Sequence, residues 1–231
     1  MKSTFLTYRR FTGIWFLTHI GALIPLALLL WAAVTQNLTV NPIQDITQRT
    51  GKAALILLVL SLACTPVNTL FGFRPALKMR RTLGLYAFFY AFGHFLIFIG
   101  LDYTFNWDLL KGAIFEKRFV LVGLAALLIL TALAATSFVW WQKRLGKNWK
   151  RLHQLVYLAS GLVIFHFAWA KKADISRLQG DIFQPIAFGT IIALLLVFRI
   201  PGIRKWLSGL RGRLTRWLND KSSPSVGGQE A

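Results

Sequence analysis

The sequence predicts an all-α, polytopic membrane protein with six transmembrane helices and both termini in the cytoplasm. The first observation is composition. The 231-residue chain is 55% hydrophobic and 15% charged, with a mean hydropathy of +0.54, which is too apolar for a water-soluble domain of this size. The second is that apolar residues gather in runs of about 17 to 25, the length of a membrane-spanning helix. The third is that basic residues fall in the gaps between these runs.

Taken in order, the apolar runs define the six predicted spans. They lie near residues 11–35, 52–71, 82–101, 118–141, 150–170 and 184–200. The first follows basic residues, as a signal peptide does. It is about two dozen residues long, which exceeds the apolar region of a signal peptide, so we expect it to be a retained span. The predicted organisation is a cytoplasmic N-terminus at 1–10 followed by a transmembrane domain over 11–200.

The C-terminal region has a different pattern. Residues 201–220 place large apolar side chains on one helical stripe and basic side chains on the other side, which predicts a cytoplasmic amphipathic helix held at the membrane surface by anionic lipid. The stripe consists of Trp206, Leu210, Leu214, Trp217 and Leu218. Residues 221–231 are rich in Ser and Gly and predict a disordered tail.

The distribution of charge gives the predicted orientation. Of the 27 basic residues, 19 lie in the N-terminus, in two alternate loops and in the C-terminal tail. The other loops hold the remaining eight and six of the eight acidic residues. By the positive-inside rule both termini are cytoplasmic. The net charge of +19 is therefore explained by topology, which argues against nucleic-acid binding. The single cysteine, Cys64, excludes an intramolecular disulfide and a cysteine-based zinc site.

Two of the four histidines lie inside apolar runs at similar depth. His94 comes thirteen residues after Arg81, and His166 comes fifteen residues after Arg151. At about 1.5 Å per residue, both lie roughly 20 Å above the cytoplasmic boundary. Intramembrane imidazoles usually face the bundle interior and carry function, and neutral imidazole commonly ligates metal, including haem iron. We therefore predict one non-covalent haem b with His94 and His166 as its axial ligands.

Aromatic residues around these histidines are expected to surround the porphyrin. Those expected are Phe88, Phe89, Phe92, Phe95, Phe98, Phe165, Phe167 and Trp169.

The remaining candidates each have a cofactor-binding interpretation and a simpler one. His153, at the cytoplasmic boundary, is either a ligand of a second haem or a flavin-site residue, or it simply lies in water. Arg80, Arg81 and Arg151 set the topology, and their second use is to bind a flavin phosphate or a haem propionate. His19 in the first span is either a quinone or cofactor residue or a hydrogen-bonding residue between helices. No Gly-rich dinucleotide fingerprint accompanies them.

Several segments, in order, are similar to a known family. They are NPIQDITQRTG, ACTPVNTL, RRTLGLYAFFYAFGHF, TSFVWWQKRLGKNWKRLHQLVY and HFAWAKK. They resemble the MsrQ (YedZ) family, the haem-binding membrane subunits of bacterial periplasmic methionine-sulfoxide reductase systems, within the ferric-reductase-like transmembrane superfamily. By motif, the family's histidines correspond to His94, His153 and His166. Two-haem relatives carry two histidines on each of two helices, whereas this chain has one on its third span.

The resemblance implies an electron-transfer subunit of the bacterial inner membrane. It would pass electrons from the quinone pool, through haem b and FMN, to a periplasmic molybdopterin-containing catalytic subunit that reduces methionine sulfoxide in oxidised proteins. The sulfoxide chemistry would then belong to that partner. Two rival interpretations remain. One is a ferric or other metal reductase that donates directly to a small acceptor. The other is a non-redox transporter or assembly protein, which would be colourless when purified.

Overall fold

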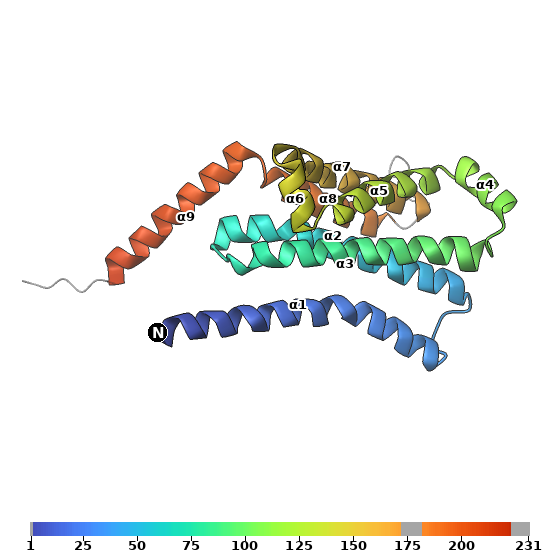
Figure 1. Cartoon of the computed structure of the whole chain (residues 1–231), viewed down its shortest axis with the longest axis horizontal. Helices are drawn as coiled ribbons and strands as arrows, with labels where there is room; N and C mark the ends of the chain where they lie inside the picture. Colours follow the sequence, from blue (N-terminus) through green and yellow to red (C-terminus); the bar gives the residue numbers. More distant parts are fainter. Residues whose placement is uncertain (1, 172–181, 223–231) are drawn as a thin grey trace, which may run out of the picture.

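The structure, a computed structural model, describes residues 2–171 and 182–222, and all regular structure within these ranges is helical (Figure 1). The helices are α1 (Lys2–Val34), α2 (Pro42–Phe71), α3 (Pro75–Ile97), the π-helical η1 (Phe98–Asp102), α4 (Trp107–Glu116), α5 (Arg118–Ala135), α6 (Val139–Leu145), α7 (Lys147–Ala170), α8 (Phe183–Val197) and α9 (Pro201–Ser222).

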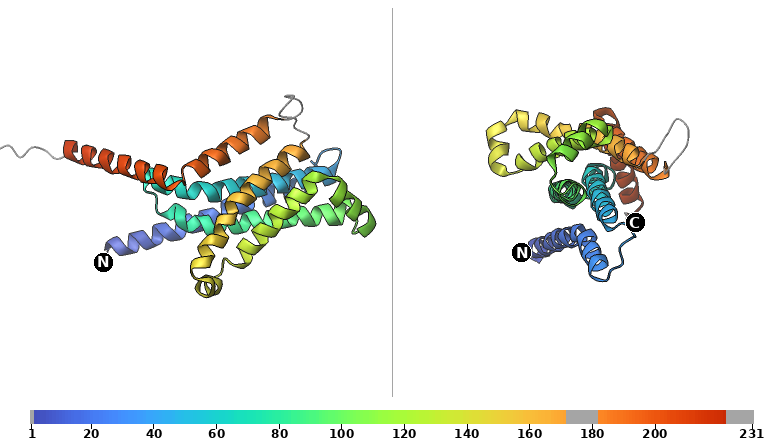
Figure 2. Two further views of the ribbon diagram at one scale, coloured as in Figure 1. Left: turned by 90° about the horizontal axis from the view of Figure 1, so that it is seen from above. Right: turned by 90° about the vertical axis from the view of Figure 1, so that its right-hand side faces the viewer.

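Five of these segments are long and apolar enough to cross a membrane on their own. They are α1, α2, α3 with η1, α5 and α7. Helix α8 has only 15 residues, and it qualifies as a sixth span only together with α9, from which it is bent by 77° (Figure 2). The predicted all-helical membrane architecture is therefore confirmed, with five to six spans.

The fourth predicted span was too long. The fourth span was expected to reach residue 141, but α5 ends at Ala135. The hydroxyls of Thr136 and Ser137 donate to the carbonyls of Ala132 and Leu133 at 2.6 and 2.8 Å. The helix ends at this point, and α6 begins after a short turn.

Other differences lie at the chain ends and in an outer connection. Helix α1 begins at Lys2, so it includes most of the segment predicted as the N-terminus, and α9 ends at Ser222, just inside the predicted tail. The rest of that tail, 223–231, lies outside the described residues. The connection between the third and fourth spans was expected to be a loop but contains helix α4, which begins because the Asn106 side chain accepts hydrogen bonds from two backbone N–H groups.

The connections that the structure describes alternate between the two ends of the bundle, as expected from the charge pattern (Figure 1). The beginning of α1, the α2–α3 turn and α9 lie toward one end, on the left in Figure 1, while the α1–α2 connection and α4 lie at the other. The carboxylates with described side chains belong to that second end: Asp45, Asp102, Asp108 and Glu116. Which end faces the cytoplasm stays a prediction.

Two helix pairs, α2 with α3 and α5 with α7, form an internal repeat that was not predicted from the sequence. Helix α2 packs mainly against α3, and α5 mainly against α7. A shift of 72 residues carries Pro75, where α3 begins, onto Lys147, where α7 begins, and carries His94 onto His166. The same shift aligns residues 51–63 with 123–135, and six of these thirteen positions are identical. Each histidine therefore belongs to one copy of the same two-helix unit, running in the same direction through the membrane.

The two prolines in helix interiors, Pro25 and Pro66, are each compensated by a side chain from elsewhere in the bundle. Proline has no N–H, and its ring disturbs the helical hydrogen-bond ladder. At Pro25 in α1, the buried Tyr90 hydroxyl of α3 enters the ladder, donating to Ala22 O at 2.9 Å and accepting from Leu26 N at 3.0 Å. This contact fixes α1 against α3.

At Pro66 in α2, the compensating side chain is an arginine. Pro66 cannot donate to the carbonyl four residues earlier, which is that of Leu62. The Arg199 guanidinium, which follows α8, donates to this oxygen at 2.7 Å and to the Tyr157 hydroxyl at 3.2 Å. Arg199 therefore joins α2, α7 and the end of α8.

Arg199→Gln is expected to destabilise the protein by about 1 to 3 kcal/mol, because Leu62 O loses its donor. When Arg199→Gln is introduced into the Pro66→Ala variant, the loss of stability should be smaller by about 1 kcal/mol, because the restored backbone N–H at position 66 can donate to Leu62 O. Thermal unfolding in detergent of the wild type, the two single variants and the double variant measures the coupling between Arg199 and Pro66. In the control, Arg204→Gln replaces Arg199→Gln, and its effect on stability should add to that of Pro66→Ala. Additive effects of Arg199→Gln and Pro66→Ala would contradict this role of Arg199.

Candidate functional site

Two histidine rings face each other between the two repeat units. His94 on α3 and His166 on α7 have ring centroids 6.1 Å apart and ring planes at 86°. Metal–imidazole bonds are about 2 Å long, so two imidazoles that bind one metal from opposite sides have centroids roughly 6 Å apart. The structure thus brings together the two histidines that the sequence placed at one depth, at the separation that a shared metal requires.

The hydrogen bonds of both rings select the same nitrogen for a ligand. His94 Nδ1 lies 2.9 Å from Thr47 O, and His166 Nδ1 lies 2.7 Å from Phe119 O. A carbonyl can only accept, so each Nδ1 carries the proton and donates it. The Nε2 of each neutral ring then has the free lone pair, which is the arrangement that outer hydrogen bonds give to metal-binding histidines.

Two glycines make this arrangement sterically possible. Gly51 follows Thr47 by one helical turn on α2, and Gly123 follows Phe119 by one turn on α5. A Cβ built on Gly51 would lie 3.1 Å from His94 Nδ1, and one on Gly123 would lie 2.5 Å from His166 Nδ1. Sequence reasoning missed both. The signal was present, because the two glycines are related by the 72-residue repeat.

The donor set favours a macrocyclic metal over a bare ion. Within residues 2–171 and 182–222, no three or more His, Cys, Asp or Glu side chains are grouped to hold a metal. A haem iron needs only two protein ligands, because the porphyrin supplies the other four. Two opposed imidazoles fit that requirement.

The aromatic residues expected around the porphyrin lie in different surroundings. Four of the eight residues are largely exposed on the bundle surface: Phe89, Phe92, Phe165 and Trp169. Phe88 and Phe167 instead pack against the core. A contributor that was not predicted is Phe119, whose ring centroid lies 6.0 Å from that of His166.

His153 lies thirteen residues before His166 on α7, about 20 Å along the helix. Its ring stacks on Trp149, with centroids 4.0 Å apart and planes at 29°, and its Nδ1 lies 3.2 Å from Trp149 O. The 72-residue shift relates it to Arg81 and not to a histidine. His153 therefore has no histidine at the equivalent position of the other repeat unit.

The three candidate arginines lie in different surroundings. Arg80 is close enough to Arg199 and His153 for electrostatic interaction. The Arg81 guanidinium carbon lies 6.0 Å from the centre of the Phe138 ring. Arg151 is exposed. Of the three, Arg80 is the one that the structure brings to His153.

His19 on α1 forms a separate polar contact with α3. Its Nδ1 lies 2.9 Å from the Tyr86 hydroxyl, and the Trp15 ring covers it at a centroid distance of 4.2 Å. Its Nε2 is buried and has no hydrogen-bond partner among the described residues. Tyr86 precedes His94 by eight residues on α3, so this contact lies about 12 Å from the facing histidines along the helix.

Comparison with known families matches residues 50–165 to a family described as the ferric reductase like transmembrane component. Similar relatives are named protein-methionine-sulfoxide reductase heme-binding subunit MsrQ. That of Rhodospirillum rubrum is 40% identical over 192 residues, covering 82% of this chain and 89% of the relative. That of Xanthomonas axonopodis pv. citri is 39% identical, covering 80% of this chain and 84% of the relative. That of Bordetella pertussis is 36% identical, covering 87% of this chain and 95% of the relative.

The chain belongs to the MsrQ family. It is thus a multi-pass protein of the bacterial inner membrane within the ferric-reductase-like group. The match to the family model begins at Thr50, beside Gly51, and ends at Phe165, beside His166. In this MsrQ-family chain it therefore covers most of the two helix pairs, including His94, and stops one residue short of His166.

Proposed function

We propose that this chain binds one haem b between His94 and His166 and serves as the electron-transferring membrane subunit of a methionine-sulfoxide reductase system. The observation that carries the proposal is the facing pair of imidazoles, each with its Nδ1 held by a backbone carbonyl and its Nε2 free. The names of the similar relatives, which describe heme-binding subunits of such a system, support it independently.

The protein residues would act by position and environment. Thr47 O and Phe119 O orient the rings and raise their basicity as ligands, and the glycines at 51 and 123 let the rings lie close to the neighbouring helices. A haem held there would supply one-electron chemistry, and its potential would depend on the two neutral imidazoles and the low-dielectric surroundings. No acid, base or nucleophile is needed for this step.

The proposed direction of transfer is outward, from the quinone pool to a periplasmic molybdopterin-containing catalytic subunit that repairs oxidised proteins. Electron entry is placed at His19 and Tyr86. The His19 Nε2, which has no hydrogen-bond partner within the described part of the chain, can hydrogen-bond a quinol hydroxyl. Under this proposal, His19→Ala slows reduction by a quinol analogue in stopped-flow spectroscopy, while dithionite still reduces the haem fully. An unchanged quinol rate would place electron entry elsewhere.

The proposed orientation puts both termini, the α2–α3 turn and α6 in the cytoplasm, with residues 201–220 on its membrane surface. Alkaline phosphatase fused after residue 39 or within α4 should be active, whereas fusions after residue 73 or residue 146 should be inactive. The reverse pattern would reverse the direction of electron flow.

We extend the proposal to FMN, which the family resemblance implies, and place its phosphate near Arg80, Arg81, Arg151 and His153 at the cytoplasmic end. The cationic Arg80 near His153 supports this location. His153 is assigned to the flavin site, since a second haem would need another histidine at its level. Flavin fluorescence of the denatured, deproteinised sample tests the assignment. A haem-loaded sample without flavin would contradict it.

The function itself is tested with purified protein. Its optical spectrum should be of a low-spin b type, with one haem per chain by pyridine haemochrome assay. Reconstituted with quinol and a periplasmic methionine-sulfoxide reductase subunit, it should support sulfoxide reduction. A colourless protein would favour the non-redox alternative. Rapid reduction of ferric chelate without any protein partner would favour the metal reductase.

A further inference from the structure

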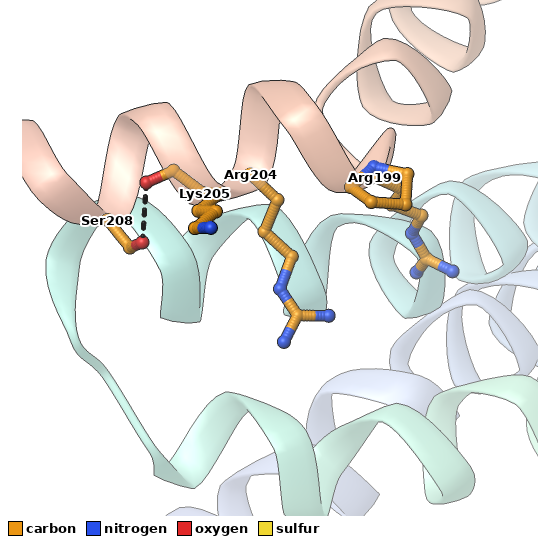
Figure 3. A pocket seen from close by; sticks show the side chains of 5 residues that line it. Arg199, Arg204, Lys205 and Ser208 are labelled. Carbon is orange, nitrogen blue, oxygen red and sulfur yellow. Dashed lines mark hydrogen bonds between the residues drawn. The ribbon is translucent and has the colours of Figure 1, made fainter.

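The elbow between α8 and α9 encloses a hollow that no part of the proposed electron path uses. It has a volume of about 410 Å³ and is lined by Arg199, Pro201, Arg204, Lys205 and Ser208. Figure 3 shows that the side chains of Arg199 and Arg204 extend from the backbone to the same side. Three cationic side chains therefore line one small space.

This positive charge has no acidic counterpart nearby among the described side chains. The four described carboxylates belong to the other end of the bundle, and the ion pair found among the described residues, Asp45 with Arg49, is there too. Arg80 adds a further cation, close enough to Arg199 for the two to repel each other. Clustered guanidinium and ammonium groups of this kind are suited to a phosphate, which accepts several charge-assisted hydrogen bonds.

Arg199 is held in place before any ligand arrives. Its two terminal nitrogens donate to Leu62 O and to the Tyr157 hydroxyl, and its guanidinium carbon lies 5.3 Å from the centre of the Tyr157 ring. Its Nε is buried and has no hydrogen-bond partner among the described residues. A fixed cation in the lining of the hollow lowers the entropic cost of binding an anion, and the exposed Arg204 and Lys205 border the same hollow.

A second hollow adjoins the first along α9. It measures about 370 Å³ and is lined by Gly202, Lys205, Trp206, Gly209, Leu210 and Arg213. Lys205 borders both hollows. Trp206 and Leu210 are 64% and 41% exposed. Gly202 and Gly209 also line this hollow, and because they have no side chains they leave its surface open as a groove. A cationic hollow next to an apolar groove suits a molecule that carries both a phosphate and a hydrocarbon chain. A free phosphate has no hydrocarbon chain to fill the groove.

We propose that the α8–α9 elbow is a binding site for an anionic phospholipid, with the phosphate held by Arg199, Arg204 and Lys205 and an acyl chain along Trp206 and Leu210. Basic pockets next to the ends of membrane helices bind lipid head groups in this way. The site fixes α9 to the membrane at one specific lipid, in addition to the general attraction of a basic helix for an anionic surface. It involves neither facing histidine, so it can be tested whether or not haem is bound.

The test is native mass spectrometry of the full-length protein in detergent, titrated with phosphatidylglycerol. The wild type should retain one tightly bound lipid, and Arg204→Gln/Lys205→Gln should weaken its affinity about thirtyfold, because each basic side chain near a membrane surface contributes roughly fivefold. The matched control, Lys143→Gln/Lys147→Gln, removes the same charge from the same end of the bundle and should bind as the wild type does. These control residues are exposed and lie outside both hollows.

Two further titrations separate the possible ligands. Zwitterionic phosphatidylcholine should bind at least about tenfold more weakly than phosphatidylglycerol, since a full negative charge is required. Inorganic phosphate at tens of millimolar should not displace the lipid. Equal weakening in the control variant would show general charge attraction and overturn the site. Displacement by inorganic phosphate would show that a free anion is the ligand, and would overturn the lipid assignment.

Discussion

His94→Ala and His166→Ala are each expected to remove the b-type absorption of the purified protein, with haem content falling by more than about tenfold. Either substitution leaves one imidazole, which cannot hold low-spin iron from both sides. It also leaves Thr47 O or Phe119 O without its donor. The dithionite-reduced minus oxidised spectrum and a pyridine haemochrome assay, normalised to protein, measure the result.

The control for this experiment is His153→Ala. His153 stacks on Trp149 at the other end of α7, so its removal should leave the haem content within about a factor of two. Size-exclusion chromatography of all three variants separates loss of haem from loss of fold. Full retention of the low-spin spectrum in either His94→Ala or His166→Ala would exclude the proposed ligand pair.

Gly123→Val is expected to have a comparable effect without touching a ligand. A Cβ at this position would lie 2.5 Å from His166 Nδ1, and a branched side chain would force the ring away from Phe119 O. Binding of haem should weaken by at least about tenfold, the usual cost of losing an outer hydrogen bond at a metal site. Gly51→Val, where the corresponding distance is 3.1 Å, should be affected in the same direction but less.

Gly93→Ala is the matched control for the glycine variants. Gly93 precedes His94 on α3, and a Cβ built there meets nothing within 4 Å. This change should leave haem binding intact and stabilise the helix by up to about 1 kcal/mol. Haem titration of the apoprotein, followed by absorbance, compares the three variants. If Gly123→Val binds haem as tightly as Gly93→Ala does, the close packing of His166 on α5 has no part in the site.

Membrane spans and the depth of the histidines could be predicted because both follow from counting. A continuous apolar run must be helical in lipid, and helical rise converts position into depth. This reasoning placed His94 and His166 at one level, and the structure brings their rings close together, with centroids 6.1 Å apart. It did not identify the carbonyls of Thr47 and Phe119, because a backbone acceptor has no sequence signature.

Features that depend on contacts between helices could not be read from hydropathy. The carbonyl that Pro66 leaves without a donor is bound by Arg199, which lies 133 residues later in the chain. In the sequence, Arg199 looks like one of the charges that set the topology. The early end of α5 depends on hydroxyl groups that a hydropathy average barely registers. Helix α4 was missed because its ten residues are shorter than any span criterion. The glycines were missed because small residues are frequent in membrane helices.

The repeat relating α2–α3 to α5–α7 has a consequence for assembly. Each half provides one imidazole together with the carbonyl that orients it, so the chain is organised like a homodimer whose two subunits have become joined by a linker. In the proposed complex neither half alone offers iron both axial ligands, and cofactor capture and the docking of the halves become a single thermodynamic event. Fragments separated within the 103–106 turn should accordingly associate more tightly in the presence of haem than in its absence.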